Sequence, residues 1–242
     1  MSKKLLWVAL ALALTLLASP AVRASKPEAP PVAEHTIAID PGHGGPDDVG
    51  STACMELLIS EGATAEEAEP YLEKHVNLDI ARRLEALLLD SGAVVHMTRE
   101  EDEALSNHDR AAGANAAGAE VLVDLHLNGW TEPTMDGLYV LFGRARKDKA
   151  FALAMHDAMI ENEGLIAAED EFIDFGVRQL AAGVMLWTEM PSALLESAFI
   201  SNAWECQQLH AGVRQDQIAG SIHRALEAWF DDPQDPWGGG RK

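Results

Sequence analysis

The feature that most constrains this chain is an alternation of short apolar runs with longer segments of helical periodicity. Each apolar run holds four to six residues, and the segments between them place apolar residues three or four positions apart. This alternation is typical of βαβ units, whose parallel strands are joined by crossover helices. We therefore expect one α/β domain with a mostly parallel sheet. The expected strands are 36–40, 94–98, 121–126, 138–142 and 193–196, and the expected helices are 73–89, 107–117, 147–163 and 216–230.

The N-terminal segment, residues 1–24, has the basic start, apolar run and small-residue end of a secretory signal peptide. Its apolar run, Leu5 to Leu17, is shorter than the roughly 20 residues that span a bilayer. We therefore predict export, to the periplasm or as a secreted protein, without a stable membrane anchor. The remaining chain is predicted to comprise a linker at 25–34, a monomeric domain at 35–231 and a flexible tail at 232–242.

The chain is strongly acidic, with a formal net charge of −21. Cleavage after residue 24 would remove three basic residues and no acidic one, which changes the net charge to −24. Binding to nucleic acid depends on clustered lysine and arginine side chains. We therefore exclude nucleic acid as a partner.

Two cysteines are present, Cys54 and Cys206. In an exported protein they could form a disulfide. Nothing in the sequence brings their Cα atoms within bonding distance, so we expect two separate thiols and keep a single bridge as the alternative.

Two histidines directly follow predicted strands: His43, which is flanked by glycines, and His126. The carboxyl ends of parallel strands meet at one edge of a sheet, so we expect both imidazoles at the same rim. The glycines beside His43 allow the backbone to approach a ligand closely. One histidine at a strand end is more often a structural hydrogen-bonding group, whereas two at equivalent ends make a metal site nearly as plausible as the structural role.

Two carboxylates are candidates to join these histidines. Glu73 opens a predicted helix and could complete the His2Glu ligand set of a catalytic zinc site. Its alternative role is to favour the positive end of the helix dipole. Glu196 ends a buried strand, where an acid is costly unless it has a chemical task or a partner. A structural ion pair is the alternative for Glu196.

Four ordered segments carry a resemblance to a known family. They resemble the zinc-dependent N-acetylmuramoyl-L-alanine amidases of the Amidase_3 family, over nearly the whole chain from about residue 37 to 230. The resemblance implies a three-layer α/β domain with a twisted, mostly parallel six-stranded sheet. It also implies that His43, Glu73 and His126 bind Zn2+ and that Glu196 is the catalytic acid. The segments are "AIDPGHGG" at 38–45, "EKHVNL" at 73–78, "TREEDEALSNHDRAAGANAAGAEVLVDLHLN" at 98–128 and "MPSALLESAFISN" at 190–202.

The implied reaction is hydrolysis, by zinc-activated water, of the amide between N-acetylmuramic acid and the L-alanine of the stem peptide in peptidoglycan. Two alternatives stay open. One is a zinc peptidase that cuts another amide of the stem peptide, although no HExxH motif is present. The other is a non-catalytic wall-binding or regulatory protein with the same fold. A protein activator is a further partner that the resemblance allows.

Four residues near the expected site match or depart from the family's motifs. Arg110 and Asn115 match a helix of the family, and we expect them to pack that helix against the strand of His126. Asp124 departs from the family's usual small polar residue; a hydrogen bond to a metal-bound histidine is a minority interpretation for it. Asn128 matches the family without an assigned role.

Residues 51–72 form an insertion that separates two of the expected ligands, and no accessory wall-binding module is present. Either this insertion or the acidic stretch at 164–176 could cover the site and regulate it. The simpler interpretation is that both are solvated surface segments.

Overall fold

The structure, a computed structural model, describes residues 29–161, 172–180 and 183–231. Within these residues six strands form one sheet in the order β2-β1-β3-β6-β4-β5. The predicted signal peptide and the predicted tail lie outside the described residues. The strands are β1 (Thr36–Pro41), β2 (Val94–Met97), β3 (Val121–Asn128), β4 (Gly137–Phe142), β5 (Ile173–Gln179) and β6 (Ser192–Phe199).

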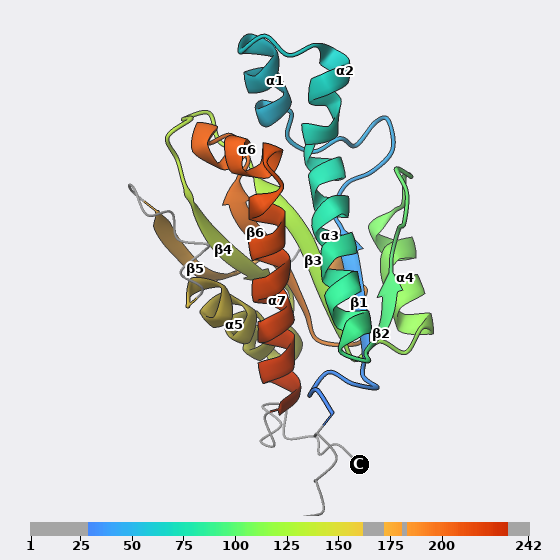
Figure 1. Cartoon of the computed structure of the whole chain (residues 1–242). Helices are drawn as coiled ribbons and strands as arrows, with labels where there is room; N and C mark the ends of the chain where they lie inside the picture. The colour runs from blue at the N-terminus through green and yellow to red at the C-terminus, as the bar shows by residue number, and fades with distance from the viewer. Residues whose placement is uncertain (1–28, 162–171, 181–182, 232–242) are drawn as a thin grey trace, which may run out of the picture.

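Helices cover both faces of this sheet, so the predicted three-layer α/β architecture is confirmed. α3, α5 and α7 pack together over one face and bury the larger apolar cluster there (Figure 1). α4 and the short η2 helix cover part of the other face. The helices are α1 (Ala53–Ser60), α2 (Ala65–Ala68), η1 (Glu69–Tyr71), α3 (Glu73–Asp90), α4 (Asn107–Ala116), α5 (Ala145–Ile160), η2 (Val184–Leu186), α6 (Ala203–His210) and α7 (Val213–Asp231).

The sheet is mostly parallel, as predicted. β2, β1, β3 and β6 pair in parallel, and β4 pairs antiparallel with β6. β5 then pairs in parallel with β4 at the edge of the sheet. These four parallel strands, β2, β1, β3 and β6, therefore present their carboxyl ends at one rim of the sheet. α1 and α6 also lie at this rim (Figure 1).

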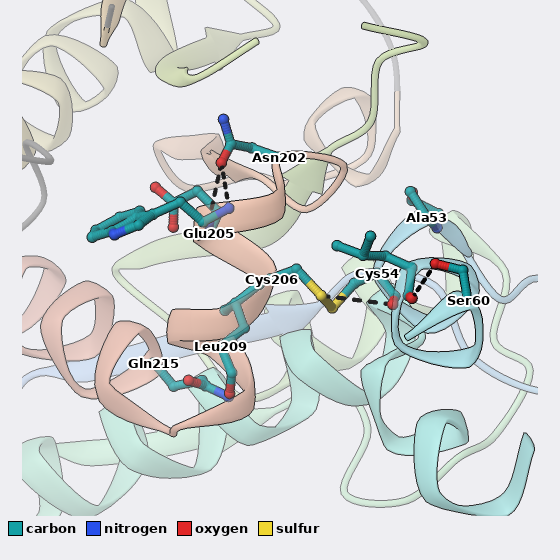
Figure 2. Close-up of a disulfide and its surroundings, with 11 residues drawn as sticks. Ala53, Cys54, Ser60, Asn202, Glu205, Cys206, Leu209 and Gln215 are labelled. Atoms are coloured by element: carbon teal, nitrogen blue, oxygen red, sulfur yellow. Dashed lines mark hydrogen bonds between the residues drawn. A yellow bond between two sulfur atoms is a disulfide. The ribbon is translucent and has the colours of Figure 1, made fainter. Parts of the chain in front are cut away.

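All five predicted strands and all four predicted helices are present, within a few residues at their ends. The insertion at 51–72 contains α1, α2 and η1, and outside it three elements were missed: β5, η2 and α6. The edge strand β5 includes the end of the acidic stretch at 164–176, of which residues 164–171 lie outside the described residues. The short helix α6 follows β6 and begins after Asn202, whose side chain caps it by accepting from the backbone of Trp204 and Glu205 (Figure 2).

The expectation of two separate thiols was wrong. Cys54 of α1 and Cys206 of α6 form a disulfide, with their Cα atoms 5.4 Å apart (Figure 2). The two cysteines are 152 positions apart in the chain, so only the packing of α1 beside α6 brings them together. The bridge ties the 51–72 insertion to the rest of the domain.

The predicted linker at 25–34 is not uniformly solvent-exposed. Val32, within the turn at 31–34 that leads into β1, is fully buried in the larger apolar cluster. Among the described residues, no helix is both long enough and apolar enough to cross a membrane.

Candidate metal centre

The polar side chains at the carboxyl rim share one face of the sheet. His126 of β3 is paired in register with Glu196 of β6, and Asp124 is paired with Leu194. Leu194 belongs to the apolar cluster beneath α4, and side chains alternate between faces along a strand. His126, Asp124 and Glu196 therefore project on the α4 side of the sheet, beyond the part that this helix covers.

His43 lies in the loop after β1 and has a left-handed backbone conformation, with φ 64°. Gly42, just before it, is where this loop passes closest to β3. A Cβ atom at position 42 would lie 2.4 Å from the imidazole of His126, so a larger residue does not fit. The absence of a side chain at this position allows the two imidazoles to approach, with ring centroids 4.7 Å apart.

Two buried arginines hold this loop. Arg110 of α4 pairs with Asp40 at 2.8 Å and donates to the carbonyl oxygen of His43 at 2.6 Å. Arg99 donates to the carbonyl oxygens of Pro41 and Gly42 at 2.8 and 3.0 Å. The expectation that Arg110 packs α4 against the strand of His126 was wrong, because its contacts are with the end of β1 and the His43 loop.

Glu73 is the first residue of α3 and is almost completely buried. Its Oε2 accepts a hydrogen bond from the backbone N–H of Ser51 at 2.8 Å, and its Oε1 accepts from that of Leu127 at 3.1 Å. The carboxylate is thus fixed between the insertion and β3, and not merely placed to favour the helix dipole.

The three residues converge on one point. Oε1 of Glu73 lies 3.1 Å from Nε2 of His43 and 3.3 Å from Nδ1 of His126. One ligand atom from each residue lies within 4.8 Å of the other two. Two imidazoles and a carboxylate at this spacing can hold a metal ion.

A carboxylate lies on the far side of each imidazole, hydrogen-bonded to His43 and within ion-pair distance of His126. Nδ1 of His43 lies 2.6 Å from Asp48, and Nε2 of His126 lies 3.3 Å from Asp124. Metal-binding histidines commonly direct their second nitrogen to such a partner, which fixes the ring's orientation. The sequence pointed to Asp124 in this position, whereas Asp48 was missed.

The electrostatics of the cluster favour positive charge. Burial opposes ionisation of Glu73, but its hydrogen bonds to His126 and His43 outweigh burial and lower its pKa. Burial also works against a charged His126, yet Asp124 and Glu73 raise the pKa of this imidazole well above its ordinary value. A cation bound here would displace the protons that these imidazoles otherwise attract.

Glu196 lies beside this cluster, and its pKa is shifted in the opposite direction from that of Glu73. Burial raises the pKa of Glu196 to about 7, against the opposing effect of His126 and with Glu73 and Asp124 adding to the rise. Within the described part of the chain, its buried Oε2 has no hydrogen-bond partner. This observation disfavours the structural ion pair and leaves a carboxyl group that can exchange a proton near neutral pH.

The structure gives Asn115 a different role from the expected one, and it shows where Asn128 lies. The amide of Asn115 donates to the carbonyl oxygen of Trp187 and accepts from the backbone of Glu189. It therefore fixes the segment before β6 and does not pack α4 against β3. Asn128 ends β3, where its carbonyl oxygen accepts from Ile200 and its residue lines a pocket beside Glu196.

The donor set fits zinc. Two imidazoles and one carboxylate form a common ligand set of catalytic zinc sites, which keep one position for water. Two further features are consistent with such a site. A carboxylate lies behind each imidazole, and Glu196 has a buried oxygen without a hydrogen-bond partner in the described residues.

A comparison with known protein families agrees with this arrangement. The family described as N-acetylmuramoyl-L-alanine amidase, Amidase_3, matches residues 37–228. The chain belongs to this family. As an Amidase_3 protein, it carries His43, Glu73, His126 and Glu196 within the matched region.

Individual relatives are similar over most of the chain. The N-acetylmuramoyl-L-alanine amidase LytC of Bacillus subtilis is 31% identical over 83% of this Amidase_3 protein, which spans only 36% of LytC. The germination-specific N-acetylmuramoyl-L-alanine amidase of the same species is 28% identical, over 87% of this chain and 86% of that protein. The structure of the N-acetylmuramoyl-L-alanine amidase AmiC2 of Nostoc punctiforme is 26% identical and covers 82% of this chain and 98% of its own, with a TM-score of 0.67.

Proposed function

We propose that this Amidase_3 protein is a zinc-dependent hydrolase that cleaves the amide between N-acetylmuramic acid and the L-alanine of the stem peptide in peptidoglycan. The observation that carries this proposal is the position of Glu196 directly opposite His126 in the sheet, beside the three-residue cluster. The names of its relatives support the choice of bond.

In this proposal His43, Glu73 and His126 hold Zn2+ through the atoms that face one another in the cluster. Zinc, when bound, supplies a Lewis acid that polarises a carbonyl group and lowers the pKa of a water molecule. The hydrogen bonds from Ser51 and Leu127 keep the Glu73 carboxylate in place, and Asp48 and Asp124 keep the imidazole rings in place.

Glu196 carries out the proton transfers. Its carboxylate accepts a proton from the attacking water and then delivers that proton to the nitrogen of the departing L-alanine. The protonated nitrogen leaves as the free amino group of the stem peptide, and the lactyl group keeps the new carboxylate. A residue with a pKa of about 7 can accept and donate a proton at neutral pH.

Purified peptidoglycan digested by zinc-loaded protein provides the test. Mass spectrometry is expected to detect intact stem peptides with a free L-alanine amino group and glycan strands that have lost their peptides. Shortened stem peptides would instead identify a zinc peptidase. Protein that binds zinc yet releases neither product would be a non-catalytic wall-binding or regulatory protein.

Export belongs to the same proposal, because peptidoglycan lies outside the cytoplasm. The predicted signal peptide at 1–24 supports it. A protein activator also stays a prediction. The CwlD amidase of Clostridioides difficile has been solved in complex with the GerS lipoprotein, but at 21% identity this likeness concerns the fold alone.

A further inference from the structure

The pocket that Asn128 lines has in its wall Tyr139, the residue paired in register with Glu196. It has a volume of about 200 Å³, and we call it the Arg178 pocket. Its walls come from the ends of β3 and β6, the start of β4 and the edge strand β5. The residues that matter here are Asn128, Trp130, Tyr139, Phe175, Arg178 and Phe199.

Neighbouring residues on three strands connect the wall of this pocket with the candidate metal centre. Tyr139 of β4 is paired in register with Glu196 of β6, just as Glu196 is paired with His126. Residues opposite one another in an antiparallel pair have neighbouring side chains on the same face. The row His126, Glu196, Tyr139 therefore runs from the metal centre directly to the wall of the pocket.

Arg178 is the cation of this pocket and lies over its aromatic wall. Its guanidinium carbon is 5.8 Å from the centroid of the Tyr139 ring and 5.5 Å from that of Phe175. Its Nε donates to the carbonyl oxygen of Phe175 at 3.1 Å. Within the described residues no carboxylate pairs with Arg178, although the chain is strongly acidic.

The size of the pocket indicates what it can hold. Sites for complete small ligands have volumes of about 300–1,000 Å³, so a pocket of about 200 Å³ next to Glu196 holds only one part of a larger substrate. The scissile amide has two such parts: a glycan on its acyl side and a peptide on its amine side.

Charge distinguishes these two parts. The lactyl carboxyl of the glycan is consumed in the amide, so the glycan side is neutral, whereas the stem peptide has free carboxylates. Another pocket, of about 590 Å³, lies between the start of the insertion and Trp130, a residue that also lines the Arg178 pocket. Its one ionisable lining residue in the described chain is Glu56, which disfavours an anionic peptide there.

We propose that the Arg178 pocket binds the peptide side of the substrate, with Arg178 pairing with a carboxylate of the residue that follows L-alanine. An arginine guanidinium is suited to this task, because its planar set of donors matches a carboxylate. The aromatic wall holds the guanidinium in position and packs against the peptide backbone. This inference rests on the proposed amidase function.

The test uses the full zinc-loaded protein and two soluble substrates, N-acetylmuramoyl-L-alanyl-D-glutamate and its diamide, in which both glutamate carboxyls are amides. Arg178→Gln is expected to raise KM for the dicarboxylate about tenfold, the size expected for losing one hydrogen bond to a charged group, with kcat nearly unchanged. For the diamide, KM should not change. Arg178→Lys should recover part of the affinity, because it keeps the charge without the planar donors.

Lys149→Gln is the matched control, since it removes one positive charge from an exposed position of α5. Equal effects of Arg178→Gln on both substrates, or none on either, would overturn the inference. An effect that grows with glycan length and not with peptide charge would assign the pocket to the glycan, which also overturns it. If the wild-type protein cleaves neither substrate nor peptidoglycan, the proposed function itself fails.

Binding of the product peptide gives an independent readout. Calorimetry of L-alanyl-D-glutamate with the zinc-loaded protein should give a dissociation constant that rises about tenfold in Arg178→Gln. Identical affinity in the two proteins would count against the proposal even if the kinetic constants differ.

Discussion

Arg110 ties the end of β1 to His43, because one guanidinium pairs with Asp40 and donates to the carbonyl oxygen of His43. The pair is almost completely buried, at 4% and 3% side-chain exposure. A buried carboxylate that loses its partner is costly, whereas an exposed ion pair contributes little.

Arg110→Ala should therefore lower the free energy of unfolding by about 3–5 kcal/mol, because it removes the ion-pair partner of buried Asp40. Urea unfolding checks this value. Arg83→Gln, which breaks the solvent-accessible contacts with Asp79 and Asp216, should cost no more than about 1 kcal/mol. Adding Asp40→Asn to Arg110→Ala should recover part of the loss; strictly additive costs would mean that the two residues are not coupled.

Glu196→Gln should bind zinc like the wild type and lower kcat for peptidoglycan cleavage by about 10²- to 10⁴-fold, because the amide cannot accept a proton. Metal analysis and product mass spectrometry measure the two properties separately. Glu189→Gln is the control, since it changes an exposed carboxylate in the segment before β6. Wild-type turnover in Glu196→Gln would remove this residue from the proton transfer.

Replacing both Cys54 and Cys206 with serine should destabilise the protein by about 2–5 kcal/mol, since the bridge closes a long loop in the unfolded chain. The comparison is urea unfolding of the double variant and of the wild type with and without reductant. Faster amide exchange should appear first in α1 and α6. Equal stability of oxidised and reduced wild type would show that packing alone holds the insertion.

The pair of His156 and Asp174, at 2.7 Å, predicts a pH dependence for the attachment of β5 to α5. Burial opposes the charged imidazole, but the hydrogen bond to Asp174 outweighs it and raises the pKa of His156 above 6.5. Burial likewise opposes ionisation of Asp174, but the bond to His156 lowers its pKa below 3.8. The pair therefore stabilises the fold between the lowered pKa of Asp174 and the raised pKa of His156. This stabilisation is lost as pH rises through the pKa of His156 and as pH falls through the pKa of Asp174.

The stability difference between wild type and His156→Gln should accordingly shrink above pH of about 7, where an unperturbed histidine is neutral. Unfolding experiments at a series of pH values from 5 to about 9 would measure it. A difference that stays constant over this range would mean that the pair does not titrate as described.

The sequence predicted the strands that build the metal centre because each is an apolar run followed by a polar residue. Parallel strands present such residues at one rim, which predicted that His43 and His126 lie together. The resemblance to the amidases added Glu196 to them. Glu73 was a candidate ligand from its place at the start of a predicted helix, but its position depends on contacts with Ser51 and Leu127 that local sequence does not encode.

The edge strand β5 escaped prediction for a physical reason. Its segment, IDFGVRQ, has two charged residues and a glycine at φ 71°, and its pairing with β4 is irregular at this point. Ile173, Phe175 and Val177 do alternate with Asp174, Gly176 and Arg178, but none of the strand's residues is buried. The segment was therefore interpreted as part of the acidic surface stretch at 164–176. Arg178 was missed with it. Asp48 and the Cys54–Cys206 bridge were also out of reach, because each depends on how distant or irregular segments fold back.

Gly42 takes no part in metal coordination or proton transfer. Its position nevertheless tolerates no larger side chain. A methyl group there would collide with the ring of His126 and with the carbonyl oxygen of Leu125, at 2.4 and 2.7 Å. In a saturation library selected for wall-lytic activity, position 42 should therefore be as intolerant as the three ligands. What this enzyme must preserve at its centre includes an empty space as well as the groups that surround it.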